Sequence, residues 1–521
     1  KGEARIILNE VNSRNPSQLN GFVEVAGKKA QVVIANPAGI SCDGCGFINA
    51  NRATLTTGQP QMKNGSLTGF SVERGEIQIT GKGMDASRTD YTDIIARSVK
   101  INAGIWAQDL KVTTGRNNVD IAHGQTEKKA ADASSQPQVA LDVSSLGGMY
   151  AGKIRLVGTE TGVGVRNAGH IGAQAGAVTL TADGRIENSG SISAKTDVHL
   201  ATTRELHNSG SVYAGQDTQI QSDGVFTHTG SVASRRNTRI QTARLTGGER
   251  SLLAAGVKDD GRLAAAGNLT VSTTGELAAH GQVLSGGDMQ LKGQGLDLSN
   301  SRIQGQHTGL DAGSGNLSTQ NAQLSAGTLS ARTAGQFSNN GGTINADTLQ
   351  ISAQSLSNRK GSLIQTGTGD FSLNLPGGVD NREGLLAANG AVRLDALSLD
   401  NRKGKVQAAQ SGSLQVKTTG AVDNQQGRLL ASSDILINTQ ALNNDNGLIS
   451  AAAGTGRIKT QQAVSNTEGR MESAGRLDIS AGSLNNHQGT VVSDGLSVTL
   501  DGALDNTSGR LLSQKTLSVS G

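Results

Sequence analysis

Two cysteines stand close together in a chain that otherwise has few residues suited to chemistry. Cys42 and Cys45 are the only cysteines among the 521 residues, in the run Cys-Asp-Gly-Cys. A structural zinc site needs four strong ligands, and no pair of histidines lies near them at ligand spacing. A thioredoxin-type motif would need a βαβ context that the surrounding sequence does not provide. The pair therefore predicts neither a metal site nor a thioredoxin-like enzyme.

Residue types used in hydrolysis or group transfer form no familiar pattern. The eight histidines are scattered, and the chain has no G-x-S-x-G, G-x-G-x-x-G or P-loop signature. Acids and bases recur in short runs such as NREG, NRKG and NTEG, but they vary from copy to copy, as is typical of a solvated corner. We therefore predict that the chain is not an enzyme, with no catalytic residue, metal or cofactor.

Those short runs belong to a phrase, apolar-x-Asn-x-x-Gly, that organises the last third of the chain. Its asparagines recur at intervals of 20 to 23 residues. A period in this range indicates one supersecondary unit stacked on copies of itself. The asparagines of the phrase are Asn358, Asn381, Asn401, Asn424, Asn444, Asn466, Asn486 and Asn506.

The residues between these asparagines indicate strands. Apolar residues come in pairs two apart, as in Leu517 and Val519, and that is the period of a strand. No unit has the long run at helical spacing that a crossover helix needs. A leucine-rich repeat would carry Leu-x-x-Leu-x-Leu before the asparagine, and that run is missing. The sequence predicts an all-β parallel β-helix, a solenoid with coils of roughly 20 residues.

Asparagine suits such a coil for two reasons. It tolerates the left-handed backbone region, so we expect it at the turn itself. Stacked at the strand spacing, its amide can pair with the copies above and below, so we also predict a structural asparagine ladder.

Composition agrees with a narrow solenoid interior. Aromatic residues make up 2% of the chain and hydrophobic residues 35%, while glycines number 71. The formal charge of +4 comes from 47 basic and 43 acidic residues spread along the chain, without a basic run carrying aromatics, so we predict no nucleic-acid partner. No apolar run approaches membrane-spanning length. Because the chain starts at Lys1, we expect a processed product or a fragment.

The period is clear in places and blurred in others. Asn167, Asn188 and Asn208 follow it, and His228 occupies the next position. Between about 245 and 335 the period is looser, and Asn300 and Asn321 are its weaker members. An insertion and degenerate coils both explain the blurring.

One phrase near the start is far more specific than the rest: VVIANPAGISCDGCGFINANRATLTTG, residues 32–58. After a strand, Asn36-Pro37 starts a turn, Gly39 relaxes it and Ile40 returns the chain to the core. The phrase resembles the secretion domain of two-partner-secretion exoproteins, the filamentous-haemagglutinin-like family. Its N-P-N-G-I motif is matched by these four residues, while Ala38 replaces the second asparagine.

This resemblance, carried further by the Asn-Gly repeats, covers most of the chain, and the Cys-Asp-Gly-Cys run is similar to effectors of contact-dependent growth inhibition. It implies a right-handed β-helix in three parts. Because the family's companion N-P-N-L motif is absent, residues 1–123 are the C-terminal part of the secretion domain. Residues 124–160 form an extra-helical loop and junction, and residues 161–521 form haemagglutinin-type repeats.

The resemblance also implies a function. It predicts export through an outer-membrane β-barrel transporter of the two-partner secretion system, recognised through Asn36, Pro37, Gly39 and Ile40. The product would be displayed on the outer surface of a Gram-negative bacterium, presenting distal binding or toxin regions to a receptor on a neighbouring or host cell. In an exported protein Cys42 and Cys45 are expected to form a small disulfide rather than free thiols. The alternatives are an adhesin whose repeats bind cell surfaces and a polysaccharide-degrading β-helix.

Overall fold

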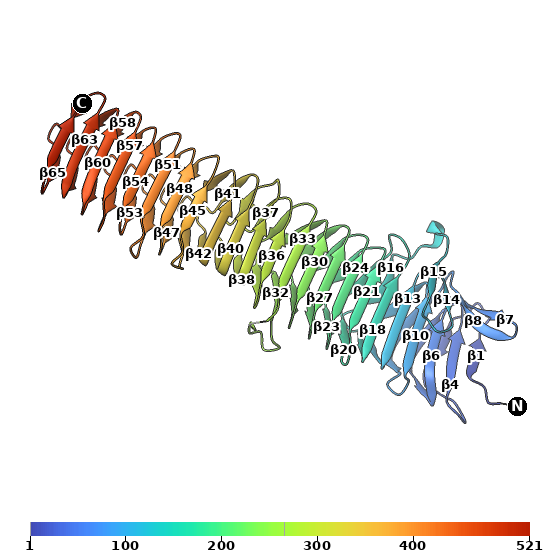
Figure 1. The fold of residues 1–521 in the computed structure, drawn as a ribbon. Coiled ribbons are helices and arrows are strands. Elements are labelled where there is room, and N and C mark those ends of the chain that lie inside the picture. The colour runs from blue at the N-terminus through green and yellow to red at the C-terminus, as the bar shows by residue number, and fades with distance from the viewer. Residues whose placement is uncertain (1, 265) are drawn as a thin grey trace. The chain divides into compact units, whose positions relative to one another are not determined.

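The computed structural model describes residues 2–264 and 266–521, and the chain divides into two compact units, Lys1–Thr273 and Thr274–Gly521. Regular structure in both units is β-strand (Figure 1). The single helical element of the described residues is the 3₁₀ turn η1 (Ala133–Ser135). The predicted all-β parallel β-helix is confirmed, with about 21 residues per turn.

A typical coil of the first unit has three short strands separated by corners. Each strand pairs in parallel with the strand three elements later, so that Ile186 stacks on Leu206 and Asn188 on Asn208. Side chains alternate along each strand, with Ile186 buried and Glu187 facing outward. This coil and the next consist of β22 (Ile186–Asn188), β23 (Ser191–Ala194), β24 (Val198–Thr202), β25 (Leu206–Asn208), β26 (Ser211–Ala214) and β27 (Thr218–Ser222).

Coils of the second unit follow the same plan with a shorter first strand. Leu399, Val406 and Leu414 point inward from successive strands of one coil and are buried. Leu399 stacks on Val422 and Val406 on Leu429 in the following coil. One or two small aliphatic side chains from each strand therefore fill the interior, as the composition predicted. The strands of this coil are β49 (Leu399–Asp400), β50 (Lys405–Ala408) and β51 (Leu414–Thr418).

The corner after each ladder asparagine uses its residues differently from our expectation. The left-handed residue is the second one after the asparagine, with φ between 54° and 57°. The expectation that asparagine itself takes the left-handed backbone is therefore wrong. Lysine, glutamate, glutamine, asparagine and serine fill that second position, at Lys360, Glu383, Lys403, Gln426, Asn446, Glu468, Gln488 and Ser508.

The glycine of each phrase is required by close approach rather than by its backbone angle. A Cβ at Gly404 would lie 2.1 Å from the carbonyl oxygen of Asn381 in the preceding coil and 2.6 Å from Oδ1 of Asn401. Any other residue would force the two coils apart at the corner. The asparagine and the glycine are therefore a matched pair, because the amide and the adjacent backbone occupy the space that glycine leaves.

Two asparagines assigned to the period are out of register. Leu317 and Ser318 pair with Phe337 and Ser338, which places Thr319 in the ladder position beside Asn339. Asn321 instead lies two residues later, at the left-handed corner position with φ of 54°. Asn300 has the same kind of corner position, with φ of 62°. Their assignment as weaker members of the asparagine period is wrong by two residues.

An antiparallel sheet that the sequence analysis did not predict covers part of the first unit. It consists of β7 (Gln59–Lys63), β8 (Ser66–Ser71), β14 (Asn117–Asp120) and β15 (Thr126–Lys128), in the order β15-β14-β8-β7. Phe70, Val72 and Val119 pack against Val33 and Ile95, giving a second apolar cluster outside the coil interior. Strand β4 (Ala30–Ala35) is therefore buried on both faces.

The interval 124–160 includes coil strands as well as extra-helical chain. Strands β16 (Val139–Val143), β17 (Gly148–Ala151) and β18 (Lys153–Gly158) pair in parallel with coil strands before and after them. The extra-helical part thus ends before Val139. The division into 1–123, 124–160 and 161–521 stays a prediction.

Candidate functional site

The corner from Asn36 to Ile40 joins two buried strands. Strand β4 ends at Ala35, and β5 (Ile40–Ile48) begins with Ile40, which is buried in the coil interior. The amide of Gly39 donates to the carbonyl of Asn36 over 3.0 Å, and Gly39 has φ of 124°, a backbone that favours glycine. The peptide N–H of Ala38 donates to Asn36 Oδ1 over 2.9 Å, so this side chain closes the turn.

Asn36 also binds the coil that precedes it, and its exposure is 0%. Its Nδ2 donates to the carbonyl of Asn15 over 3.0 Å and to the Ser17 hydroxyl over 2.9 Å. From the other side, a Cβ at Gly75 would lie 2.6 Å from the carbonyl oxygen of Pro37. The corner is therefore enclosed between the coil before it and the coil after it, and in the folded protein Asn36 has no free face.

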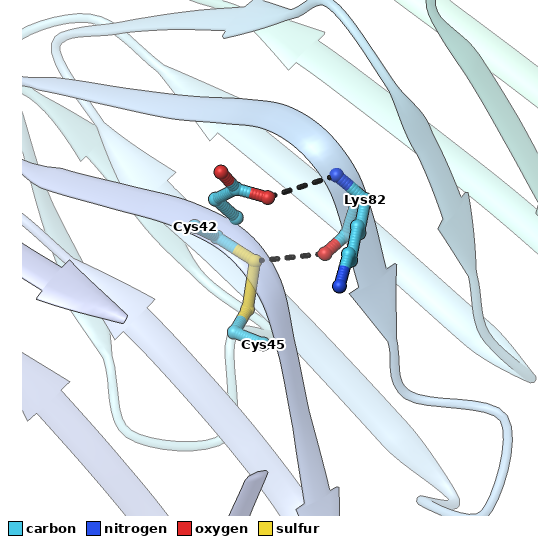
Figure 2. The surroundings of a disulfide bond; sticks show 5 residues. Cys42, Cys45 and Lys82 are labelled. Atoms are coloured by element: carbon cyan, nitrogen blue, oxygen red, sulfur yellow. Dashed lines mark hydrogen bonds between the residues drawn. A yellow bond between two sulfur atoms is a disulfide. The ribbon is translucent and has the colours of Figure 1, made fainter. Parts of the chain in front are cut away.

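Cys42 and Cys45 form a disulfide within β5 (Figure 2). Opposite it, strand β9 (Glu76–Asp85) makes a matching irregularity, and the register shifts between Asp43 and Cys45. Asp43 Oδ1 accepts from the peptide N–H of Lys82 over 2.9 Å. The disulfide therefore lies in a small loop that stacks on a loop of the next coil.

Ladder asparagines form two hydrogen-bonded series, one in each unit. In the first, Nδ2 of Asn167 donates to Asn188, and Nδ2 of Asn188 donates to Asn208, each over 2.9 Å. In the second, each amide donates to the next over 2.7–2.9 Å, from Asn339 through Asn358, Asn381, Asn401, Asn424, Asn444, Asn466 and Asn486 to Asn506. Thr319 precedes this series, its hydroxyl donating to Asn339 over 2.7 Å.

His228 takes the ladder position after Asn208. Its Nδ1 lies 3.3 Å from Asn208 Nδ2 and accepts that hydrogen bond, while its Nε2 donates to the carbonyl of Leu252 over 2.8 Å. Burial lowers the pKa of His228 to about 4 from an ordinary value near 6.5. The imidazole is therefore neutral at pH 7 and acts as a ladder substitute.

A buried polar network around Asp93 escaped the sequence analysis. Its carboxylate accepts from Arg52 Nε and Thr54 Oγ1, each over 2.8 Å, and from His123 Nδ1 over 2.9 Å. Although burial opposes ionisation, the hydrogen bonds from His123 and Arg52 lower the pKa of Asp93. The network joins β6 (Ala50–Thr56) and β10 (Tyr91–Ala96) to the loop between β14 and β15. No local signal could have found it, because its members come from distant strands.

The network contains a hydroxyl, an imidazole and a carboxylate in hydrogen-bonded order. Thr113 Oγ1 lies 2.6 Å from His123 Nε2, and His123 contacts Asp93 on its other side. This is the order of groups in a hydrolase triad. Thr113 is 0% exposed and His123 1%, however, so no substrate reaches the hydroxyl. Burial lowers the pKa of His123, which keeps the ring neutral. The Thr113–His123–Asp93 group therefore holds the covering sheet against the coils.

A second set of buried polar contacts holds the segment around η1. Arg97 pairs with Glu160 over 2.8 Å, and both side chains are about 95% buried, at 4% and 5% exposure. The same guanidinium donates to the Ser135 hydroxyl over 2.6 Å and to the carbonyl of Asp132 over 3.0 Å. One buried arginine thus ties the extra-helical segment to two coils.

Metal-binding clusters and membrane-spanning helices are both absent from the described residues, 2–264 and 266–521. No group of three or more His, Cys, Asp or Glu side chains there could hold a metal ion. None of the described helices is long and apolar enough to cross a membrane.

Comparison with family models matches both parts of the chain. Residues 1–188 match the TPS secretion domain, and residues 190–521 match the haemagglutinin repeat in six overlapping stretches: 190–272, 258–339, 321–372, 366–426, 409–468 and 451–521. The chain belongs to the two-partner-secretion exoproteins, with a secretion domain followed by filamentous-haemagglutinin repeats. The family resemblance seen in the sequence is confirmed.

Within that family the chain is related to CdiA contact-dependent inhibition toxins. It is 49% identical over 391 residues to Toxin CdiA of Yersinia pestis, a match covering 75% of this chain and 12% of that protein. It is 51% identical over 192 residues to tRNA nuclease CdiA-2 of Burkholderia pseudomallei, covering 37% of this chain and 6% of that protein. The matched region is therefore a small part of each relative.

Among solved structures, the chain is similar to the crystal structure of the filamentous hemagglutinin secretion domain. Sequence identity is 33% and the TM-score is 0.36, with 42% of this chain and 73% of that chain covered.

Proposed function

We propose that this chain is an exported, non-catalytic segment of a contact-dependent growth-inhibition toxin. It passes through an outer-membrane β-barrel transporter of the two-partner secretion system to the outer surface of a Gram-negative bacterium. There its repeats carry distal binding or toxin regions toward a receptor on a neighbouring cell.

The observation that carries this proposal is the ladder that crosses the boundary between the two matched families. Asn167 lies in the secretion domain, Asn188 is its last matched residue and Asn208 lies in the first repeat. Their amides are joined by 2.9 Å hydrogen bonds. Because the coils are continuous here, a folded secretion domain is a template on which the first repeats stack as they emerge.

A recognition role for Asn36, Pro37, Gly39 and Ile40 is part of the proposal. In the folded protein Asn36 is enclosed and its amide is bound to Asn15 and Ser17. The transporter therefore meets this corner before the neighbouring coils close on it. Pro37 suits such early recognition because its ring fixes φ locally, without help from tertiary structure.

Support for a non-catalytic role comes from where the polar groups lie. The hydroxyl of the buried Thr113–His123–Asp93 group is sealed from solvent. At the repeat corners, Asp380 and Asp400 each accept from the arginine two residues later, Arg382 and Arg402. Carboxylates held this way act as surface ion pairs rather than as a polysaccharide-cleaving pair.

The experiment compares Asn36→Asp with Ser17→Ala in cells that carry the transporter, scoring surface display and the stability of purified protein. Both variants disturb the Asn36 amide, and each is expected to lower the free energy of unfolding by about 1–3 kcal/mol. Only Asn36→Asp changes the recognised side chain, so it alone is expected to block display.

Two outcomes would count against the recognition role. Normal surface display of the Asn36→Asp variant would directly contradict the recognition role. Display that falls in proportion to stability in both variants would mean that the corner acts through folding alone. Ile77→Ala serves as a folding control, because Ile77 is buried and lies outside the four proposed recognition residues.

A further inference from the structure

One outward-facing column of the first unit gathers exposed aromatic rings around a carboxylate. Five residues on consecutive coils pair in register: Phe22 with Gly46, Gly46 with Asp85, Asp85 with Trp106, and Trp106 with Tyr150. Their strand neighbours Phe47, Met84, Ile105 and Met149 are buried, so by alternation the column faces solvent. The strands are β3 (Phe22–Glu24), β5, β9, β12 (Gly104–Trp106) and β17.

The aromatic residues of this column are unusual in this chain. Aromatic side chains are 2% of the sequence, and Trp106 is its single tryptophan. Phe22 is 56% exposed and Trp106 44%. Trp106 and Tyr150 stack with centroids 6.0 Å apart and planes 17° from parallel. Large aromatic surface held rigidly in water is typical of a binding surface.

A glycine makes room for the Phe22 ring on the coil next to Asp85. A Cβ at Gly46 would lie 2.3 Å from the ring edge of Phe22 and 2.8 Å from the backbone oxygen of Asp85. The ring therefore lies over Gly46, on the coil next to Asp85. Trp106 pairs in register with Asp85 from the coil on the other side, and its ring extends over Gly104 and toward Gly83.

Only part of the hydrogen-bonding capacity of the Asp85 carboxylate is used. Its Oδ1 accepts from the peptide N–H and the hydroxyl of Ser87, over 3.1 and 2.6 Å. Among the described residues, no cation lies within ion-pair distance of it. The Ser87 hydrogen bonds lower the pKa of Asp85, with a smaller pull from Arg88, so the group is ionised at neutral pH.

We propose that Phe22, Asp85, Trp106 and Tyr150 form a docking surface for an arginine side chain of a partner polypeptide. A guanidinium is planar, stacks on aromatic faces and pairs with a carboxylate through two donors, and this column carries aromatic rings and a carboxylate on neighbouring coils. Lysine makes a point charge without the planar face and fits less well. The attraction comes from Asp85 locally, because the chain as a whole carries a formal charge of +4.

The test uses the purified chain and the fluorescence of Trp106, which reports from within the column without a label. Titration with a hexa-arginine peptide is expected to give a saturable change in emission. A hexa-citrulline peptide has the same planar groups without charge and is expected to give none. Asp85→Asn is expected to weaken the apparent affinity about tenfold or more, since it removes a charge-assisted pair.

Two further variants separate the column from general electrostatics. Phe22→Ala keeps the reporter and removes one flanking ring, so it is expected to weaken binding. Asp501→Asn removes an exposed carboxylate of the second unit and is expected to leave the titration unchanged. The proposal is overturned if hexa-arginine gives no saturable change, if citrulline binds equally, or if Asp85→Asn and Asp501→Asn have the same effect.

Discussion

Two neighbouring residues at each repeat corner are constrained differently, one by its backbone angle and one by lack of space. Lys403 takes a left-handed backbone with φ of 57°, which costs a residue with a Cβ about 1–2 kcal/mol. Gly404 beside it has no such angle, yet it has no room for a side chain because the carbonyl of Asn381 lies in the way. The close contact between coils therefore explains why the repeat has a glycine at this position. The residue before the glycine is the one that adopts the strained backbone.

Substitutions at these two positions should therefore act in opposite directions. Gly404→Ala is expected to lower the free energy of unfolding by about 1–3 kcal/mol, because the added methyl overpacks the corner. Lys403→Gly is expected to be neutral or slightly stabilising, because it relieves the left-handed backbone. Guanidinium denaturation of both variants checks this. Equal loss of stability in the two variants would contradict the assignment of close approach to Gly404 and of the strained backbone to Lys403.

The ladder should respond differently from an exposed asparagine. Asn424 donates to Asn444 over 2.7 Å and accepts from Asn401 over 2.7 Å, whereas Asn438 is exposed on an outward strand position. Asn424→Leu is expected to cost about 1–3 kcal/mol by leaving buried amides without partners. Asn438→Leu is expected to change stability by less than about 0.5 kcal/mol. Denaturation midpoints that shift equally would contradict a stabilising ladder.

His228 should make part of the stability depend on pH. Its pKa is near 4 in the folded protein and near 6.5 when unfolded, so between these values the unfolded chain binds more protons. Its contribution is complete above about pH 6.5 and is lost as pH falls toward 4. His228→Asn restores the usual ladder residue and is expected to flatten this part of the profile. Thermal midpoints at pH 7 and pH 5 give the comparison, in which His123 is common to both proteins.

The repeat asparagines show how much of the fold could be predicted from the sequence. The period of Asn358 to Asn506 predicted the stacked coils, because each copy repeats the same frame. We assigned the left-handed backbone to the asparagine because asparagine tolerates that region. The residue that adopts it lies two positions later, and its type varies from coil to coil. Asn300 and Asn321 were misassigned because Thr319 fills the true position without resembling asparagine.

At the scale of elements, buried polar groups hold the extra-helical chain against the coils, and the segment around η1 is the clearest case. Arg97 uses one guanidinium to hold Glu160, Ser135 and the carbonyl of Asp132. Removing one partner of a buried ion pair leaves the other charge without compensation, which is far more costly than losing an exposed pair.

Arg97→Ala is therefore expected to lower stability by about 3–5 kcal/mol and to expose residues 129–138 to proteolysis. Lys129→Ala is the matched control, because its pair with Glu73 is partly exposed and contributes about 0–1 kcal/mol. Limited proteolysis of the two variants should cut the Arg97 variant first. Equal cutting would show that the segment is held by other contacts.

The covering sheet was absent from the sequence-based prediction for a physical reason. Strands β7, β8, β14 and β15 have the same short alternation as coil strands, and their pairing joins residues near 60–70 to residues near 117–128. Nothing local distinguishes a strand that continues a coil from one that covers it. Asp93 and His123 are likewise brought together only by the fold.

At the scale of the molecule, stability and export follow from the same stacking. Within each unit a coil contacts chiefly its neighbours, so a change in one corner is felt locally and each new coil is stabilised by the one before it. Such a chain can fold from its secretion domain onward as it emerges. In the proposed order of folding, the laddered junction at Asn167, Asn188 and Asn208 is the template for the first repeats.

The most direct test of export is the accessibility of this segment to external protease on intact cells, with and without the partner transporter. The account predicts cleavage of the segment only when the transporter is present, with a periplasmic marker protected in both cases. Cleavage at the surface without the transporter, or protection of the segment when the transporter is present, would contradict it.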